Sequence, residues 1–178
     1  MASYAAAKRR LFSFDGIDAA VINADDEFGE RLAKELRAHS KVFTYSVNNA
    51  QADVFTQNTR YSLNSISSDV VSPWGRATIT IPLIGEFNLS NALAALTAML
   101  AAGGDFNALI AAFSEVTAVK GRMEIVSDSL SRSIDDKTVV VDYAHTPQAL
   151  ELALAALRSH TKGRLWCVFG CGGDRDND

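Results

Sequence analysis

The stretch from Val139 to Asp174 constrains the fold more than any other part of the chain. It begins with three consecutive valines, whose β-branched side chains are typical of a buried strand, and Asp142 follows where that strand should end. Thr146 and Pro147 then have the chemistry of a helix cap and a first helical residue. A second apolar run, Leu165–Phe169, opens into a glycine-rich segment. The stretch predicts a strand–helix–strand unit, and in open α/β sheets ligands bind at the carboxyl ends of the strands.

The helix of this unit has a clear periodicity. Leu150, Leu154 and Leu157 recur every three or four residues, as on one face of a helix, and Gly163 is suited to end it. We therefore expect the two apolar runs on either side of the helix to be parallel neighbours in one sheet.

The first 50 residues repeat this pattern. A short apolar strand is predicted over Ala19–Asn23, and a helix capped by Asp25 or Asp26 over Glu27–Ala38. The alternating residues of Lys41–Val47 predict another strand. Strand, helix and strand in this order again indicate a parallel sheet, so we assign the chain to the α/β class.

The middle of the chain predicts two more strands and two helices. Residues 48–58 are polar and unpatterned, which indicates a loop. Strands are expected over Tyr61–Val71 and Ala77–Ile84, around a Pro-x-Gly turn. An Ala/Leu-rich helix follows from about Asn91 to Ala102, and a second helix over Asp105–Phe113.

Composition excludes several classes of function. The chain has 178 residues and a formal net charge of −4, so neither nucleic acid nor an anionic membrane is an expected partner. No apolar run reaches the roughly 18 residues that span a bilayer, and the first residues lack the apolar core of a secretory signal. Cys167 and Cys171 are too few for a disulfide framework or a zinc site. The cytoplasm is the expected location.

Several polar residues stand where a ligand could bind. Asp142 can accept hydrogen bonds from sugar hydroxyls, and His145 can contact a phosphate or a base. Equally, Asp142 can cap a turn while His145 is solvated, and the residues alone leave both interpretations open. Asn88 and Asn91 are three residues apart near a helix start, so both can point the same way, or each can be an ordinary cap.

The Gly170–Asp174 segment is a weaker signal. Its backbone could approach a ligand, but it is not the dinucleotide-binding fingerprint because the third glycine is absent. Cys171 could act as a nucleophile, although no partner base is near it in sequence. The sequence also contains no G-x-x-x-x-G-K-[ST] phosphate loop.

Several separated motifs resemble those of one family, the Mur ligases of peptidoglycan assembly. The likeness is strongest to the branch that makes UDP-N-acetylmuramoyl-tripeptide (the MurE type), and it runs nearly end to end. The CGGDRD run is its most specific part. The matching segments are Tyr4–Phe12, Asn23–Asp26, Gly85–Asn91 (GEFNLSN), Gly121–Glu124 (GRME), Asp142–Pro147 (DYAHTP) and Leu165–Asp176, which ends in CGGDRD.

The resemblance implies two partial domains, with a boundary near residues 119–124. Residues 1–120 are similar to the second half of the family's central ATPase domain, and residues 121–178 to the start of its Rossmann-like C-terminal domain. ATP and Mg²⁺ are the implied cofactors. The family's phosphate loop and magnesium ligands are expected outside this chain, so no metal ligand is assigned within it. The chain is thus expected to be a piece of a ligase and to be inactive alone.

The resemblance also implies a reaction and a set of site residues. The family phosphorylates a substrate carboxylate with ATP and then joins an amino group to the acyl phosphate. For this branch the substrates are UDP-N-acetylmuramoyl-L-alanyl-D-glutamate and a diamino acid, meso-diaminopimelate or L-lysine, and the enzyme is monomeric. The resemblance places Asn88 and Asn91 at the adenine side of the ATP site, Asp142 at the ribose and His145 beside the same nucleotide. Arg122 reaches ATP from the interdomain hinge, and Arg122 and His145 are the catalytic candidates. Asp174 and Arg175 belong to a loop that faces the substrate.

Two other functions stay open. One is another amide ligase of the same superfamily, such as a folylpolyglutamate or cyanophycin synthetase, against which the CGGDRD run argues. The other is a non-catalytic nucleotide-binding or interaction module, for which a missing phosphate loop would be natural.

Overall fold

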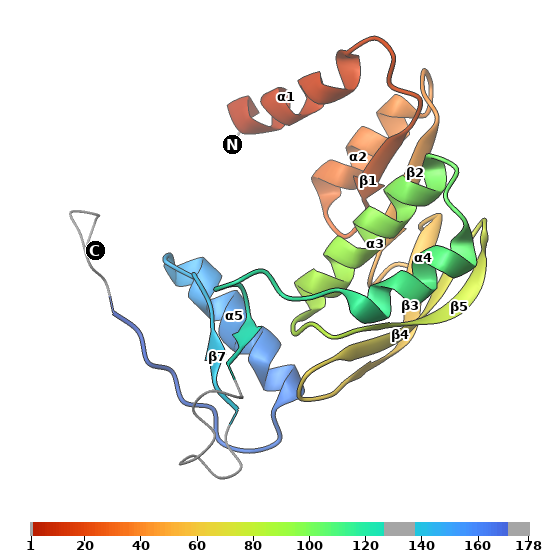
Figure 1. The fold of residues 1–178 in the computed structure, drawn as a ribbon. Helices are drawn as coiled ribbons and strands as arrows, with labels where there is room; N and C mark the ends of the chain where they lie inside the picture. Colours follow the sequence, from red (N-terminus) through yellow and green to blue (C-terminus); the bar gives the residue numbers. More distant parts are fainter. Residues whose placement is uncertain (1, 127–137, 171–178) are drawn as a thin grey trace.

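The computed structural model describes residues 2–126 and 138–170. It contains a five-stranded sheet with the strand order β1-β2-β3-β4-β5 and a separate two-stranded sheet of β6 and β7. The elements are, in chain order, α1 (Ala2–Arg10), η1 (Leu11–Ser13), β1 (Ala20–Asn23), α2 (Glu27–Leu36), β2 (Val42–Ser46), β3 (Val54–Tyr61), β4 (Ile66–Ser72), β5 (Gly75–Ile81), α3 (Glu86–Ala101), α4 (Phe106–Ala112), η2 (Phe113–Glu115), β6 (Glu124–Ile125), β7 (Val140–Val141) and α5 (Pro147–His160). Figure 1 shows the large sheet with its helices as one part of the molecule and α5 with the small sheet as the other.

The first strands form the predicted parallel unit, and helices pack on both of its faces. β1 and β2 pair in parallel, and Asp26 caps α2 by accepting a hydrogen bond from the Gly29 N–H at 2.7 Å. On one face Ile22 of β1 packs with Leu32 of α2. On the other face Tyr45 of β2 packs against the core that α3 covers. The α/β class predicted from the sequence is therefore confirmed.

The remaining strands form an antiparallel meander with one buried face. β4 pairs antiparallel with both β3 and β5. Ile79 and Ile81 of β5 are fully buried, whereas Thr78 and Thr80 are exposed, so the predicted alternation holds. The main core lies between this buried face and the helices α3 and α4. Its buried members are Val47, Val54, Ile66, Val70, Ile79, Ile81, Leu89, Ala92, Leu93, Leu96, Leu100, Phe106 and Phe113.

The second part of the molecule is built around α5. Its first turn follows the prediction, because Pro147 is the first helical residue and the Thr146 side chain accepts a hydrogen bond from the Ala149 N–H at 3.2 Å. Within the described part of the chain, no helix has the length and the apolar composition that crossing a bilayer requires.

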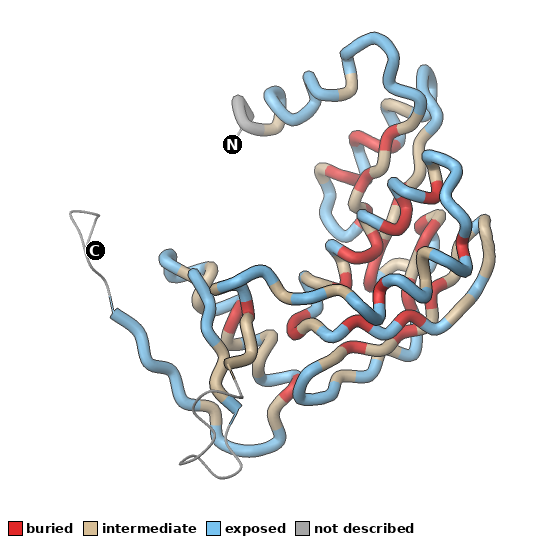
Figure 2. Tube along the Cα trace, viewed as in Figure 1, coloured by how far each residue is buried: buried red, intermediate tan, exposed pale blue. Residues whose placement is uncertain are grey.

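The strand predicted over Leu165–Phe169 is not formed. No described strand pairs with this segment. Its large apolar residues are exposed: Trp166 by 80%, Val168 by 98% and Phe169 by 77%. Figure 2 shows the segment as an exposed stretch of chain after α5. β7 pairs instead with β6, and antiparallel. An apolar run supplies side chains for a sheet, but a strand also needs a neighbouring backbone to satisfy its N–H and C=O groups.

Two element boundaries also differ from the prediction. β3 begins at Val54, inside the 48–58 region that was expected to be a loop. α3 begins at Glu86 rather than at Asn91, and its cap is Gly85, with φ of 94° and no side-chain hydrogen bond. Neither Asn88 nor Asn91 is therefore a helix cap.

Candidate functional site

The segment that joins the two parts of the molecule is a braced turn. Gly121 and Met123 both have left-handed φ values, 71° and 46°. The Gly121 N–H donates to Glu124 Oε2 at 2.7 Å, and the Arg122 N–H donates to the Val119 carbonyl at 2.9 Å. Glycine adopts a left-handed φ without steric cost, whereas methionine does not. The backbone of Met123 therefore depends on support from its surroundings.

Asp142 supplies part of that support from the end of β7. Its Oδ2 accepts a hydrogen bond from the Met123 N–H at 2.9 Å, and its Oδ1 accepts one from the Ala144 N–H at 2.8 Å. Asp142 thus caps a turn, which is one of the two interpretations left open by the sequence. Each carboxylate oxygen has further acceptor capacity, and the residue is exposed, so the same group can also accept hydrogen bonds from a ligand.

Two of the predicted site residues lie against one aromatic ring, and a third, Asp142, precedes that aromatic residue in the chain. The Arg122 guanidinium lies over the Tyr143 ring, 5.2 Å from its centroid. The His145 ring lies 5.2 Å from the same ring, and His145 Nδ1 is 3.0 Å from the Tyr143 carbonyl. We call Arg122, Asp142, Tyr143 and His145 the hinge cluster. All four are exposed, and they combine a cation, a carboxylate, an aromatic ring and an imidazole, which are groups suited to phosphate, ribose and base.

The two asparagines lie at the start of α3, next to the hinge rather than in the hinge cluster. Asn88 is half-buried and donates through Nδ2 to the Ile84 carbonyl at 2.7 Å. Asn91 lies nearly one turn further along the helix and is exposed. Ile84 packs with Met123 in a small apolar cluster. The start of α3 and the hinge turn thus touch through this cluster, but Asn88 bonds its own chain.

Other predicted site residues cannot be placed. Asp174 and Arg175, like Cys171, lie outside the described residues. Cys167 is a free, exposed thiol. Over residues 2–126 and 138–170, no group of three or more His, Cys, Asp or Glu side chains is arranged to hold a metal ion.

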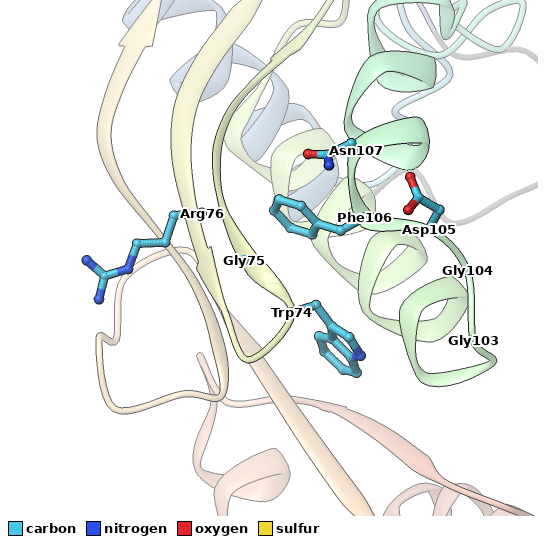
Figure 3. Close-up of a pocket in the computed structure, with 8 residues that line it drawn as sticks. All are labelled: Trp74, Gly75, Arg76, Gly103, Gly104, Asp105, Phe106 and Asn107. Atoms are coloured by element: carbon cyan, nitrogen blue, oxygen red, sulfur yellow. The ribbon is translucent and has the colours of Figure 1, made fainter.

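A surface hollow of about 610 Å³ lies elsewhere, between the β4–β5 turn and the start of α4. Figure 3 shows Phe106 pointing from α4 toward β5, with Trp74 below it and Arg76 directed away from the hollow. None of the predicted site residues lines it. We place the candidate site at the hinge, because that is where groups able to bind a nucleotide converge. The residues around the hollow are Trp74, Gly75, Arg76, Gly103, Gly104, Asp105, Phe106 and Asn107.

Sequence reasoning missed two residues here. Tyr143 lies within the DYAHTP motif but had no assigned role, although it is the ring on which Arg122 and His145 converge. His160 was not singled out at all, and it is 6% exposed. The sequence could have indicated the burial of His160, because its spacing from Ala153 and Leu157 places all three residues on the packed face of α5.

The fold and the hinge define a two-part α/β protein. Residues 1–99 match the Mur ligase middle domain, and residues 121–178 match the Mur ligase, glutamate ligase domain. The chain belongs to the Mur ligase family.

Named relatives narrow the comparison. The chain is 49% identical over 177 residues to the UDP-N-acetylmuramoyl-L-alanyl-D-glutamate–2,6-diaminopimelate ligase of Gloeobacter violaceus, and the match covers 99% of this chain and 35% of that protein. A solved structure of a ligase with the same name is 41% identical, with a TM-score of 0.77, and covers 97% of this chain and 35% of that one. The chain thus spans about a third of the length of the curated relatives that it matches.

A more distant structure shows the fold alone. Mycobacterium tuberculosis folylpolyglutamate synthase complexed with ADP is 22% identical, with a TM-score of 0.68. That match covers 88% of this chain and 34% of the synthase.

Proposed function

We propose that the chain carries the hinge side of the ATP site in a ligase that joins a diamino acid to UDP-N-acetylmuramoyl-L-alanyl-D-glutamate. The diamino acid is meso-diaminopimelate or L-lysine. The observation that carries the proposal lies at the junction of the two matched segments. Arg122 and His145 contact the Tyr143 ring there, and Asp142 accepts a hydrogen bond from the Met123 N–H. The identity to diaminopimelate-adding relatives supports the choice of substrates.

Each member of the hinge cluster has a role that fits its chemistry. The Arg122 guanidinium neutralises phosphate charge, which grows as the phosphoryl group is transferred, so Arg122 is a catalytic candidate. Asp142 accepts hydrogen bonds from the ribose hydroxyls with the lone pairs that its two backbone partners leave free. His145 lies beside the same nucleotide as the second catalytic candidate. Asn88 and Asn91 lie on the adenine side, where the exposed Asn91 amide is the one available to a base.

The reaction proceeds through an acyl phosphate. A carboxylate oxygen of the substrate attacks the terminal phosphorus of ATP, and ADP leaves. The neutral amino group of the diamino acid then attacks the acyl carbon, the nitrogen gives up one proton to solvent, and inorganic phosphate leaves as the amide forms. Mg²⁺ would offset phosphate charge in such a step, but the described residues do not fit its ligation, so no step assigned to this chain depends on the metal.

The proposal also covers the domain boundary, the substrate loop and the state of the whole enzyme. The boundary between the ATPase domain and the Rossmann-like domain lies near residue 120. Asp174 and Arg175 belong to the loop that faces the substrate. The enzyme that contains this chain is a cytoplasmic monomer.

The test is ATP binding by the ligase that contains this chain. Asp142→Ala should raise the Michaelis constant for ATP roughly tenfold or more, because a charge-assisted hydrogen bond is worth about 1.5–3 kcal/mol. The constant for the UDP substrate should change little. Arg122→Ala should lower kcat as well as ATP affinity, because its charge acts on the transferring phosphoryl group.

The control is Glu124→Ala, which removes the brace on Gly121 without removing a proposed ligand contact. It should disturb the same turn and leave the ATP constant within about threefold of the unmodified enzyme. An equal loss of ATP affinity in Glu124→Ala and Asp142→Ala would show that Asp142 acts only on the turn. Selective activity with folates in place of the UDP substrate would favour the other amide ligases instead.

A further inference from the structure

His160, the last residue of α5, makes two hydrogen bonds to distant parts of the chain. Its Nε2 lies 3.0 Å from the Gly85 backbone N, and its Nδ1 is hydrogen-bonded to the Ser62 carbonyl. These partners are 75 and 98 residues away in sequence. Gly85 is the cap of α3, and Ser62 begins the turn between β3 and β4. The buried His160 side chain of α5 is therefore hydrogen-bonded to two segments of the part that contains the large sheet.

The two partners fix the protonation state of the imidazole. A backbone N–H can only donate, so Nε2 must be the acceptor toward Gly85, and a carbonyl oxygen can only accept, so Nδ1 must carry the proton toward Ser62. His160 is thus a neutral imidazole with its hydrogen on Nδ1. A second proton on Nε2 would face the Gly85 N–H and remove this bond.

Tyr61 and Glu86 link the surroundings of His160 to the start of α3. The Tyr61 side chain meets the imidazole edge-on, with the ring centroids 5.1 Å apart, and its hydroxyl donates to Glu86 Oε2 at 3.0 Å. Burial first, and then the Glu86 carboxylate, raise the pKa of Tyr61 to about 12, so the phenol stays a donor at neutral pH. Glu86 follows Gly85 in the chain, so both contacts converge on the first residues of α3.

We call the two hydrogen bonds of His160, to Gly85 and to Ser62, the latch. α5 connects the latch to the hinge cluster. Its 14 residues rise roughly 21 Å, and its cap, Thr146, follows His145 directly. In the middle of the helix, Ala153 packs with Ile84 and Met123. The hinge cluster therefore stands at one end of a short rigid helix, and His160 fixes the other end against the start of α3.

We propose that His160 is a positioning residue that sets where the hinge cluster lies relative to Asn88 and Asn91. It does so by holding the end of α5 to Gly85 and Ser62 through both imidazole nitrogens. This inference rests on the proposed function, because the ligand shared by these two groups of residues is the nucleotide. His160 itself does not touch the nucleotide.

The test uses three variants that separate the two hydrogen bonds. In His160→Gln the amide oxygen can replace Nε2 as the acceptor for Gly85, and in His160→Asn the amide nitrogen can replace Nδ1 as the donor to Ser62. His160→Phe keeps a ring against Tyr61 and removes both bonds. Leu157→Ala is the control, because it loosens packing on the same face of α5 without changing a hydrogen bond at His160.

The first readout is independent of nucleotide. The ¹⁵N spectrum of the imidazole should show a protonated Nδ1 and an unprotonated Nε2. Amide exchange at Gly85 should be slow in the unmodified chain and in His160→Gln, and at least about tenfold faster in His160→Phe and His160→Asn, because an N–H that loses a bond worth about 1.4 kcal/mol opens more often.

The second readout is ATP affinity of the ligase that contains this chain. His160→Phe should bind ATP roughly tenfold more weakly, His160→Gln should recover most of that loss, and Leu157→Ala should lose stability with affinity kept within about threefold. An unmodified enzyme that binds no ATP would overturn the proposed function, and Gly85 exchange would then still decide whether the latch exists. Equal Gly85 exchange in the Gln and Phe variants, or unchanged ATP affinity in an ATP-binding Phe variant, would overturn the role of His160.

Discussion

At the scale of single residues, Met123 links stability to the candidate site. Its backbone has a left-handed φ of 46°, although its side chain is 2% exposed and packs with Ile84 and Ala153. A left-handed conformation costs a non-glycine residue roughly 1–2 kcal/mol, which the buried side chain and the Asp142 hydrogen bond offset. The residue that braces this backbone is thus the one we assign to ribose. A carboxylate that holds a strained backbone and, as we propose, also accepts hydrogen bonds from the ribose would couple nucleotide binding to hinge geometry.

Tyr61 offers a residue-scale prediction that needs no substrate. Burial is the largest single cause of its raised pKa, followed by the hydrogen bond and then the charge of Glu86. Glu86→Gln should therefore lower the pKa from about 12 without returning it to the ordinary value near 10, because the burial remains. Spectrophotometric titration of tyrosine absorbance would measure this, with Tyr61→Phe to assign the signal. A Tyr61 that titrates alike with and without the Glu86 carboxylate would show that the hydrogen bond does not form.

The same pKa has a consequence for stability. Between pH 10 and 12 the unfolded chain releases the Tyr61 proton while the folded chain keeps it. Its contribution to stability is therefore complete below pH 10 and is lost as the pH rises through the folded value. The Tyr61→Phe variant should lack this part of the alkaline decline.

At the scale of elements, the connection between β2 and β3 is unusually short for a parallel pair. It has no helix, and side chains hold it instead. Asp25 accepts hydrogen bonds from the Ser46 hydroxyl and from the Val47 N–H, the latter at 3.1 Å. Asp53 Oδ2 accepts from both the N–H and the hydroxyl of Thr44 at 2.7 Å. Carboxylates at the two ends of the connection therefore replace the packing that a crossover helix provides.

Asp53→Asn should test the importance of this brace. Burial alone would raise the pKa of Asp53, but the hydrogen bonds from Thr44 and the charge of Arg37 outweigh it and hold the pKa below its ordinary value. The stability that Asp53 contributes is therefore present above the ordinary carboxyl pKa and is lost as the pH falls through the folded value. We expect a loss of about 1–3 kcal/mol at pH 7 and a smaller one near pH 3, measured by urea unfolding.

Asp69→Asn is the matched control for that experiment. Its carboxylate also accepts two side-chain hydrogen bonds, from Asn58 and Thr78, but it lies on the exposed face of the antiparallel strands. Water can replace those partners, so the Asp69 variant should lose less stability than the Asp53 variant. Equal losses of unfolding free energy in the two variants would show that the Thr44 hydrogen bonds of Asp53 stabilise the fold no more than the exposed ones of Asp69.

The elements also show which parts of the fold could be predicted from the sequence. β1, α2 and β2 were predictable because local periodicity and a local cap define them. β3 was missed because Asn58 has φ of 54° at a register shift between Gln57 and Arg60, which breaks the alternation. The strand predicted over Leu165–Phe169 failed because its formation depends on a neighbouring strand that local sequence does not specify.

For the site, local motifs were informative and long-range contacts were not. Arg122, Asp142 and His145 were chosen from short motifs. In the structure Arg122 and His145 lie against the Tyr143 ring, and Asp142 is hydrogen-bonded to the Met123 N–H, next to Arg122 in the chain. The link between Met123 and Asp142 and the partners of His160 arise from residues 19 to 98 positions apart, where only the folded chain decides the pairing.

At the scale of the whole molecule, the chain should not turn over ATP by itself. Phosphoryl transfer depends on positioning and on neutralising phosphate charge, and loss of one major charged group can cost a thousandfold or more, roughly. The 178 residues contain no G-x-x-x-x-G-K-[ST] loop, and the described residues hold no metal-binding cluster. The hinge cluster alone supplies one guanidinium and no cradle of backbone N–H groups for a triphosphate. Phosphate release by the purified chain, with ATP, magnesium, the UDP-dipeptide and each diamino acid, should stay at background.

The full-length Gloeobacter violaceus relative, assayed beside the chain, provides the positive control. The Asp142→Ala variant of the chain tests whether any phosphate release comes from the hinge cluster. Substrate-dependent release whose Michaelis constant for ATP rises in Asp142→Ala would mean that this chain handles the phosphoryl group without a phosphate loop. In that case the charge needed for transfer would have to come from a lysine or arginine within these residues, and Arg122, already held over the Tyr143 ring at the hinge, would be the first to substitute. Release with the same Michaelis constant for ATP in the Asp142 variant would instead point to a contaminating phosphatase, because loss of the proposed ribose contact is expected to raise that constant roughly tenfold.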